Sequence, residues 1–111
     1  MWFNPQCSNC RNAKALLSEQ GAHVQELRYL EERPDRAALE RLMAMLGIDD
    51  PRQMMRTGEQ AYRDLALADA DLDELLDAMV ANPILIQRPI AIRGDRAVIA
   101  RPPERALELL E

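Results

Sequence analysis

The two cysteines of this chain lie three residues apart, in the segment Cys7-Ser8-Asn9-Cys10. They follow a short apolar start and the turn dipeptide Asn4-Pro5, and they open a helix-like run over residues 11–20. A cysteine at a helix N-terminus faces unpaired backbone N–H groups and the positive end of the helix dipole, and both favour the thiolate. Because the thiolate is the reactive form of cysteine, this spacing predicts a reactive thiol.

Two other uses of a cysteine pair fit the sequence less well. A structural zinc site needs four ligands, and beyond the two cysteines the chain offers only His23, so we expect no metal. A purely structural disulfide would close a very short loop and would add little stability. A redox-active or nucleophilic pair beside a strand-helix-strand pattern is the favoured interpretation.

Length and charge narrow the class of protein further. A chain of 111 residues predicts a single domain over residues 1–111, and a net charge of −5 argues against nonspecific nucleic-acid binding. The sequence has neither an apolar run of about 18 residues nor a signal-peptide pattern. Two cysteines without an export signal indicate a reducing cytoplasm, where free thiols persist.

Hydrophobic spacing and turn residues predict the order of the elements. Residues 1–3 end a strand, residues 11–20 form a helix that stops at Gly21, and residues 24–29 alternate as a half-buried strand. A helix begins at Pro34-Asp35 and closes at Gly47, and another runs from Asp71 to Asn82 with short helices and turns between them. The remaining elements are a hairpin of residues 90–92 and 97–99 around Gly94-Asp95 and a last helix after Pro102-Pro103, with Leu107 and Leu110 facing inward.

This order is strand, helix, strand, several helices, hairpin and helix. It is the order of a thioredoxin-like α/β fold, with a mixed sheet and a helical insertion over roughly residues 35–82. Pro89 stands directly before the third strand, where such folds hold a cis-proline opposite the active-site cysteine, although most X–Pro bonds are trans.

Three arginines follow apolar segments at the ends of predicted elements: Arg56, Arg88 and Arg101. The guanidinium fork matches tetrahedral oxyanions through paired N–H···O bonds, so three of them near a helix N-terminus would form an anion pocket. Taken singly, each is better explained by surface pairing with the abundant carboxylates of the chain.

Together these segments resemble the glutaredoxin-coupled arsenate reductase family. The resemblance covers nearly the whole chain, in order, through Asn4-Pro5-Gln6-Cys7-Ser8-Asn9-Cys10-Arg11, Tyr29-Leu30-Glu31, Met55-Arg56-Thr57, Asn82-Pro83-Ile84-Leu85-Ile86-Gln87-Arg88-Pro89-Ile90 and Arg101-Pro102-Pro103-Glu104. It implies that Cys7 is the catalytic cysteine, that Arg56, Arg88 and Arg101 bind the oxyanion, and that Pro89 is structural at the site.

The sequence departs from this family at three places. Phe3 replaces the usual histidine before Asn-Pro, which removes a polar neighbour of the cysteine. Cys10 occupies a position that is commonly serine in the reductases, whereas the related Spx-type transcriptional regulators carry a C-x-x-C pair there. The strand ahead of Asn4 is also several residues shorter than in the family, so we expect it to be a stub. Arg101 is retained, which argues against a regulator of the Spx type.

The resemblance implies a mechanism. The Cys7 thiolate attacks arginine-bound arsenate and an oxygen leaves as water, glutathione then attacks the arsenic–cysteine adduct, and glutaredoxin resolves the mixed disulfide as arsenite is released. Glutathione is thus a co-substrate, no cofactor is bound, glutaredoxin is the protein partner, and a monomer is expected.

Two other functions stay open on the sequence. Cys7 and Cys10 could serve a general thiol-disulfide oxidoreductase without an oxyanion substrate, or Cys10 could replace glutathione by forming an internal disulfide with Cys7. The same pair could also belong to a non-enzymatic redox sensor of the Spx type, which would bind a protein such as RNA polymerase. The arginines favour the reductase, and the cysteine pair favours the other two.

Overall fold

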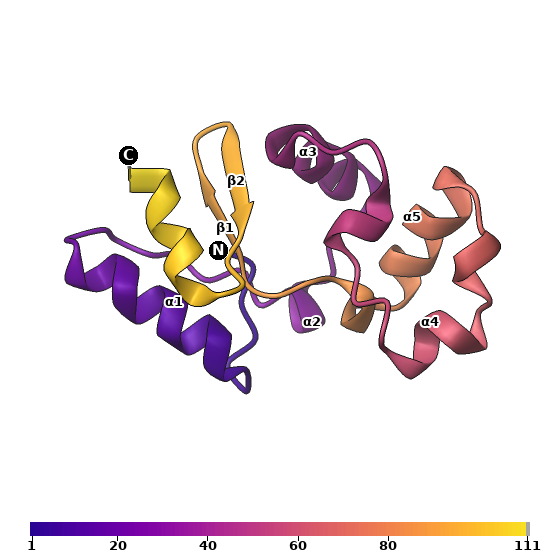
Figure 1. Ribbon diagram of the computed structural model, residues 1–111, viewed down its shortest axis with the longest axis horizontal. Coiled ribbons are helices and arrows are strands. Elements are labelled where there is room, and N and C mark those ends of the chain that lie inside the picture. Colours follow the sequence, from indigo (N-terminus) through magenta and orange to yellow (C-terminus); the bar gives the residue numbers. More distant parts are fainter. Residues whose placement is uncertain (111) are drawn as a thin grey trace. The chain divides into compact units, whose positions relative to one another are not determined.

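The computed structural model describes residues 1–110 and divides the chain into two compact units (Figure 1). The first unit combines Met1–Glu32 with the chain from Arg88 onward, and the second is the continuous segment Arg33–Gln87. The second unit contains the predicted helical insertion and extends a few residues beyond each of its predicted ends. The prediction of one domain over the whole chain stays a prediction.

Helix α1 (Ser8–Glu19) begins where the sequence predicts a reactive thiol. Cys7 is its N-cap residue with extended backbone (φ −94°, ψ 121°), and the turn before it is closed by a hydrogen bond from the Cys7 N–H to the Asn4 carbonyl at 3.0 Å. The helix buries Cys10, Ala13 and Leu17, which share one face at spacings of three and four residues. It ends before Gly21, whose φ of +84° few other residues adopt.

The hairpin of strands β1 (Ile90–Arg93) and β2 (Arg96–Ile99) is confirmed, with Ile90 opposite Ile99 and Arg93 opposite Arg96. Its two-residue turn places Gly94 at a φ of +62°, as the Gly94-Asp95 pair predicts. Trp2 adds to this sheet through an antiparallel bridge to Ile90 and a parallel bridge to Leu27. The sheet is therefore mixed, with the segment around Trp2 inside it.

The predicted strand over residues 24–29 is too long. Only Leu27 forms a bridge, although the N-terminal ammonium of Met1 donates to the Gln25 carbonyl at 2.9 Å and the Leu27 N–H donates to the Met1 carbonyl at 2.7 Å. Tyr29 instead begins the short helix α2 (Tyr29–Glu32). The chain leaves the sheet early because the Asn4-Pro5 turn ends the neighbouring segment that would extend the ladder.

The last element, η4 (Pro103–Leu110), is a 3-10 helix that packs on α1 and on both hairpin strands. It buries Ala106 and Leu109, whereas Leu107 and Leu110, which the sequence predicts to face inward, are half-buried and pack against the edge of the same core. A 3-10 helix has three residues per turn, so the inward positions recur every three residues and start from Ala106.

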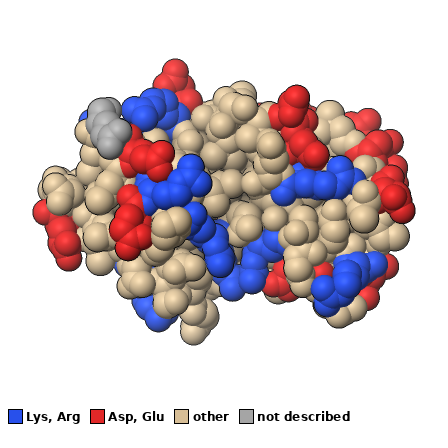
Figure 2. Space-filling view, viewed as in Figure 1, with Lys and Arg blue, Asp and Glu red and all other residues tan. Residues whose placement is uncertain are grey.

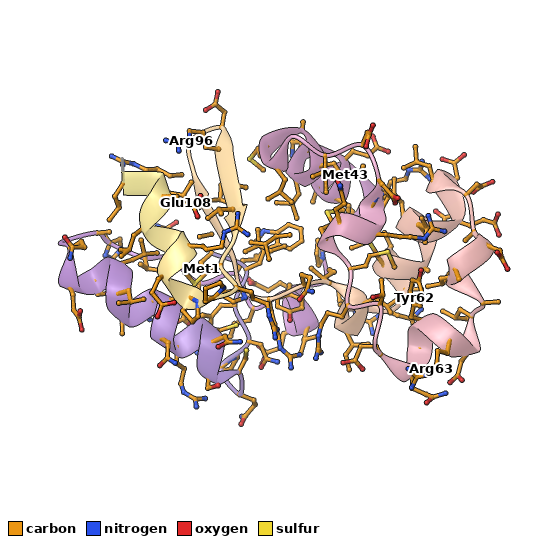
Figure 3. All side chains as sticks on the ribbon, viewed as in Figure 1. Met1, Met43, Tyr62, Arg63, Arg96 and Glu108 are labelled. Carbon is orange, nitrogen blue, oxygen red and sulfur yellow. The ribbon has the colours of Figure 1, made fainter. Side chains whose placement is uncertain are left out.

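Hydrogen bonds from the hairpin satisfy the last carbonyl groups of η4. Arg93 donates to the Leu109 carbonyl at 2.9 Å and Arg96 to the Glu108 carbonyl at 3.2 Å; Figure 3 labels Arg96 on the hairpin and Glu108 on η4. The core between these elements consists of seven buried side chains: Ala13, Leu17, Ala91, Val98, Ala100, Ala106 and Leu109.

The second unit is helical and its caps follow the sequence. Asp35 accepts from the Ala38 N–H at 2.8 Å at the start of α3, and Asp71 forms a capping box with Glu74 at the start of α5. Leu72 was expected inside but is 48% exposed, because it occupies the first helical position. The elements are α3 (Arg36–Leu46), η1 (Pro51–Met54), α4 (Gln60–Asp64), η2 (Leu67–Asp69), α5 (Leu72–Ala81) and η3 (Pro83–Leu85).

Arg56 stands on a backbone pairing within this second unit. Met55 forms an antiparallel bridge with Ile86, and the Arg56 N–H donates to the Leu85 carbonyl at 2.7 Å. The preceding turn is held by Arg52, whose guanidinium donates to three carbonyl groups, those of Leu67, Ala68 and Ala70. The backbone at Arg56 is therefore fixed from two directions.

A groove of about 820 Å³ opens at one end of the first unit's sheet. Residues 22–27 line one side of it and Ile92 and Arg93 the other, and Leu17 and Leu109 also contribute. Ile90 exchanges hydrogen bonds with Trp2. The backbone N–H and C=O groups of every second residue of a strand point to the same side, so those of Ile92 face this groove. The groove thus has the shape and the backbone partners that suit one more stretch of strand.

We expect an engineered extension ahead of Met1, a short segment with alternating apolar residues, to raise the melting temperature by several degrees. Each added ladder hydrogen bond contributes roughly 0.5–1.5 kcal/mol, and each newly buried aliphatic side chain about 1.5–3 kcal/mol. Thermal unfolding followed by circular dichroism measures the change. An extension of equal length made of glycine and serine is the control, and equal melting temperatures for the two proteins would contradict the prediction.

Candidate active site

Cys7 lies at the junction of the Asn4-Pro5 turn and helix α1. Its carbonyl accepts the N–H of Arg11 at 3.2 Å, so its backbone already belongs to the helix hydrogen-bond pattern. The residue is 9% exposed and packs in a small cluster with Phe3 and Cys10. The Cys7-Ser8-Asn9-Cys10 segment therefore places one nearly buried thiol at the positive end of a three-turn helix.

The pKa of Cys7 is lowered. Burial is the largest single influence and raises the pKa, but it is outweighed by the amide and the thiol of Cys10 and by the Arg88 guanidinium, all of which stabilise the thiolate. The Cys10 amide contact falls short of a full helix-cap hydrogen bond, so it acts chiefly through the attraction of the N–H dipole for the charged sulfur. Cys7 is thus the thiol that ionises first.

Cys10 has the opposite character. It is fully buried, and burial first, then the neighbouring Cys7, raises the pKa of its thiol to about 11, although the Asn4 backbone amide acts in the other direction. In the ordinary pH range Cys10 is a neutral thiol that donates toward the Cys7 sulfur. Two cysteines three residues apart therefore have pKa values shifted in opposite directions, and their surroundings determine which thiol ionises first.

Arg88 brings a positive charge to the Cys7 sulfur. Its half-buried guanidinium lies within hydrogen-bonding reach of both Cys7 and Tyr29. Its Nε is buried without a hydrogen-bond partner among residues 1–110. The following Pro89 is buried, and the Arg88–Pro89 peptide is cis, as the thioredoxin-like order implies. A guanidinium with a spare buried N–H beside a thiolate is suited to hold an anion.

Arg101 lies next to Arg88. Its guanidinium donates to the Arg88 carbonyl at 3.4 Å, and its side chain is otherwise exposed. The Arg101–Pro102 peptide is also cis, which the sequence did not indicate. Within the first unit the structure therefore brings together Cys7, Cys10, Arg88, Pro89 and Arg101.

Arg56 belongs to the second unit, where it forms an ion pair with Glu59 at 2.6 Å and keeps 23% of its side chain exposed. Its part in an oxyanion pocket stays a prediction, as do the roles of Arg88 and Arg101. Figure 2 shows basic and acidic side chains interspersed on the visible face, and typical surface arginines such as Arg36 pair with several carboxylates. Arg88 and Arg101, by contrast, take part in no ion pair within the part of the chain that the structure describes.

Two residues of the site were not identified from the sequence. The sequence predicts Asn4 only as a turn residue. In the structure its backbone carbonyl accepts from the Cys7 N–H, and its side-chain Oδ1 accepts from the Gln6 N–H at 3.0 Å. Its backbone N–H faces the Cys10 sulfur. Tyr29 was assigned to a strand, yet it is fully buried beside Arg88. The Asn-Pro pair was a usable signal for Asn4, because asparagine side chains close such turns. Tyr29 belongs to the Tyr29-Leu30-Glu31 segment of the family resemblance, but nothing local to it indicates a contact with Arg88.

Outside the cysteine pair and its arginines, the described residues offer few other candidate functional groups. Over residues 1–110 no group of three or more His, Cys, Asp or Glu side chains is placed to hold a metal ion, and His23 is exposed. Nor does that part of the chain contain a helix of the length and apolarity needed to cross a bilayer. The cysteine pair and its arginines are therefore the chemical centre of the described residues.

Comparison with known proteins identifies the class. A model of the ArsC family matches residues 2–109. An arsenate reductase from Vibrio cholerae superposes with a TM-score of 0.92 at 43% identity, covering 96% of this chain and 92% of that one. An arsenate reductase of Haemophilus influenzae is 43% identical over 99% of this chain and 97% of its own length, and an uncharacterized Escherichia coli protein, YfgD, is 42% identical over 99% and 94%.

The fold is thus that of a thioredoxin-like α/β protein, as the order of elements predicts, with Cys7 at the start of its first long helix. More particularly, the chain belongs to the ArsC family.

We expect the two thiols to titrate far apart. Cys7 should be alkylated with a pH midpoint below the ordinary cysteine value of about 8.5, whereas Cys10 should stay unreactive until the pH approaches its raised value of about 11. Arg88→Gln should move the Cys7 midpoint upward, because the guanidinium favours the thiolate. Rates of iodoacetamide modification, assigned by mass spectrometry, measure both. Arg105→Gln changes a surface arginine of the same unit and is the matched control; a common midpoint for both cysteines would contradict the prediction.

Proposed function

We propose that this protein reduces arsenate, with Cys7 as the nucleophile, glutathione as the thiol donor and glutaredoxin as the partner that completes the cycle. The observation that carries the proposal is the Cys7 thiolate held beside the Arg88 guanidinium at the start of α1. The names of its relatives in Haemophilus influenzae and Vibrio cholerae support the choice of substrate.

Charge explains why arginines belong beside this thiolate. A thiolate and an oxyanion repel each other, and a guanidinium between them neutralises that repulsion while its fork orients the oxygen atoms. Arg88 contacts the sulfur and keeps a buried N–H without a partner in residues 1–110, and Arg101 lies against the Arg88 backbone. In the proposed site these two arginines, with Arg56, bind the three-fold array of arsenate oxygens.

The proposed chemistry balances over two thiols. The Cys7 sulfur attacks arsenic(V), and one oxygen leaves as water after taking up protons, which gives a cysteine–arsenic adduct. Glutathione then attacks the adduct, the two thiols are oxidised together to a mixed disulfide, and arsenic leaves as arsenite, in the +3 state. Glutaredoxin reduces the mixed disulfide and restores Cys7. We place this cycle in a cytoplasm that supplies glutathione, with the enzyme acting as a monomer.

A second candidate function rests on the contact between the two thiols. A general thiol-disulfide oxidoreductase needs a low-pKa cysteine and a neighbouring partner thiol, and Cys7 and Cys10 have that relation. A redox-sensing regulator of the Spx type would use the same pair. Neither of these functions requires Arg88 at the sulfur with Arg101 against its backbone, which is why we favour the reductase.

We expect Cys7→Ser to abolish arsenate reduction and Cys10→Ser to leave a substantial part of it. The serine hydroxyl is not ionised near neutral pH, so no nucleophile remains at position 7, whereas glutathione still resolves the adduct when Cys10 is absent. The measurement is arsenite production in the presence of glutathione and glutaredoxin. Equal and complete loss in both variants would favour the dithiol oxidoreductase, and an inactive wild-type protein would contradict the proposal.

We also expect oxyanions to protect Cys7 from alkylation through the three arginines. Replacing Arg56, Arg88 or Arg101 with alanine removes charged hydrogen bonds worth on the order of 1.5–3 kcal/mol. The concentration of sulfate or arsenate that gives half-protection should therefore rise about tenfold or more.

Two further variants make this measurement specific. Arg105→Ala should leave the protecting concentration unchanged, since that side chain pairs with Glu108. Glu59→Gln should lower it, because the ion pair at 2.6 Å competes with the oxyanion for Arg56. Protection that is insensitive to all three arginines would show that they do not form one pocket.

A further inference from the structure

The structure gives Cys10 a position that the glutathione-dependent cycle does not use. It stands at the third position of α1, one turn from the N-cap Cys7, and the two residues pack together with Phe3. Both are free thiols, and the chain has no other cysteine. Any intramolecular disulfide of this protein therefore joins Cys7 to Cys10.

We propose that Cys10 is a resolving thiol, which attacks the Cys7 sulfur of the arsenic adduct and completes one reduction of arsenate without glutathione. This inference rests on the proposed function, and it adds an internal route beside the glutathione-dependent one. The observations that carry it are the contact between the two sulfurs, the complete burial of Cys10 and the anchoring of both residues by Asn4.

Burial decides what Cys10 can react with. Cys10 is 0% exposed, whereas Cys7 is at the edge of the surface with 9% exposed. Glutathione and other dissolved reagents therefore reach Cys7, and the sulfur that Cys10 contacts is that of Cys7. Residues one turn apart on a helix have Cβ atoms about 5–6 Å apart and a disulfide needs about 3.5–4.5 Å, so a small tightening of the first turn joins them.

Asn4 fixes the relative position of the two cysteines. Its carbonyl accepts the Cys7 N–H at 3.0 Å, and its own backbone amide faces the Cys10 sulfur. The residue is nearly buried, and its Oδ1 accepts from the Gln6 N–H, which closes the turn around it. A single residue thus holds the nucleophile and delivers an N–H to the second sulfur.

The order of events follows from charge. While Cys7 is a thiolate, its negative charge disfavours a second thiolate at Cys10. Bonding of Cys7 to arsenic removes that charge, whereas the Asn4 amide and the charge of Arg88, which both favour ionised Cys10, remain. Cys10 therefore becomes a better nucleophile only after Cys7 has reacted, which prevents the two thiols from competing for the substrate.

The resolving step conserves atoms and electrons. Cys10 loses its proton to water and its sulfur forms a bond to the Cys7 sulfur, while the bond between Cys7 and arsenic breaks. The electron pair of that bond stays on arsenic, which falls from the +5 to the +3 state and leaves as arsenite. The two thiols have lost two electrons and form the Cys7–Cys10 disulfide, which two glutathione molecules or glutaredoxin then reduce.

A single-turnover experiment tests this route. Reduced protein is mixed with excess arsenate under nitrogen, without glutathione or glutaredoxin, and arsenite and free thiols are counted. We expect about one arsenite per protein molecule and the loss of both thiols in the wild type and in the control Ser8→Ala, an exposed position of the same helical turn. Cys10→Ser and Cys10→Ala should release no arsenite in this experiment but should turn over when glutathione and glutaredoxin are added.

The outcomes separate this inference from the proposed function. A wild-type protein that releases arsenite only with glutathione would overturn the internal route and leave the reductase intact. A wild-type protein that releases none under either condition would overturn both. Equal release by the wild type and Cys10→Ser without glutathione would also overturn the internal route.

A second measurement needs no arsenate. Cys7 is converted to a mixed disulfide with one equivalent of the chromogenic reagent 5,5′-dithiobis(2-nitrobenzoate), and the released thionitrobenzoate is counted. Attack by Cys10 on the Cys7 sulfur releases a second thionitrobenzoate, so we expect two per wild-type molecule and one for Cys10→Ser. One per molecule in the wild type would show that Cys10 cannot reach the Cys7 sulfur and would overturn the inference.

Discussion

The pairing of Trp2 with Ile90 is the constraint on which the first unit depends. Two backbone hydrogen bonds, of 2.8 and 3.4 Å, join these residues in an antiparallel bridge. In this register the residues after Trp2 run past those before Ile90, so the turn at Asn4 comes to lie across from Arg88. Cys7 begins α1 directly after that turn. A single strand pairing thereby brings a thiol and a guanidinium together from segments some eighty residues apart in the sequence.

With these segments in contact, the surroundings of the two cysteines shift the pKa values of their thiols in opposite directions. Cys7 sits at the end of a helix and beside Arg88, and both favour a negative charge that burial alone would oppose. Cys10 lies one turn deeper, where burial dominates and keeps the thiol neutral. The C-x-x-C spacing alone does not distinguish a nucleophile from its partner; the distinction comes from one turn of helix and the depth that goes with it.

The sequence predicted those features that local chemistry controls. Asp35 and Asp71 cap their helices by accepting hydrogen bonds from the backbone N–H groups three residues ahead. Gly94 adopts the positive φ that the hairpin turn requires. Cys7 and Arg88 were found through the motif around them, and their contact in the structure fits that interpretation. Features set by distant partners were missed: Tyr29 leaves its predicted strand to pack beside Arg88, and η4 turns Ala106 and Leu109 inward.

The groove at the end of the sheet has a consequence for how this protein behaves in solution. The backbone N–H and C=O of Ile92 face this groove, which is flanked by apolar side chains such as Leu17, Val24 and Leu109. Natural sheets commonly protect such edges, because an exposed row of N–H and C=O groups templates pairing with any extended chain that it meets. Arg93 beside Ile92 supplies a charge that opposes dense stacking of identical chains. We therefore expect self-association through this edge to increase with ionic strength, since salt screens the charge but leaves the edge unchanged.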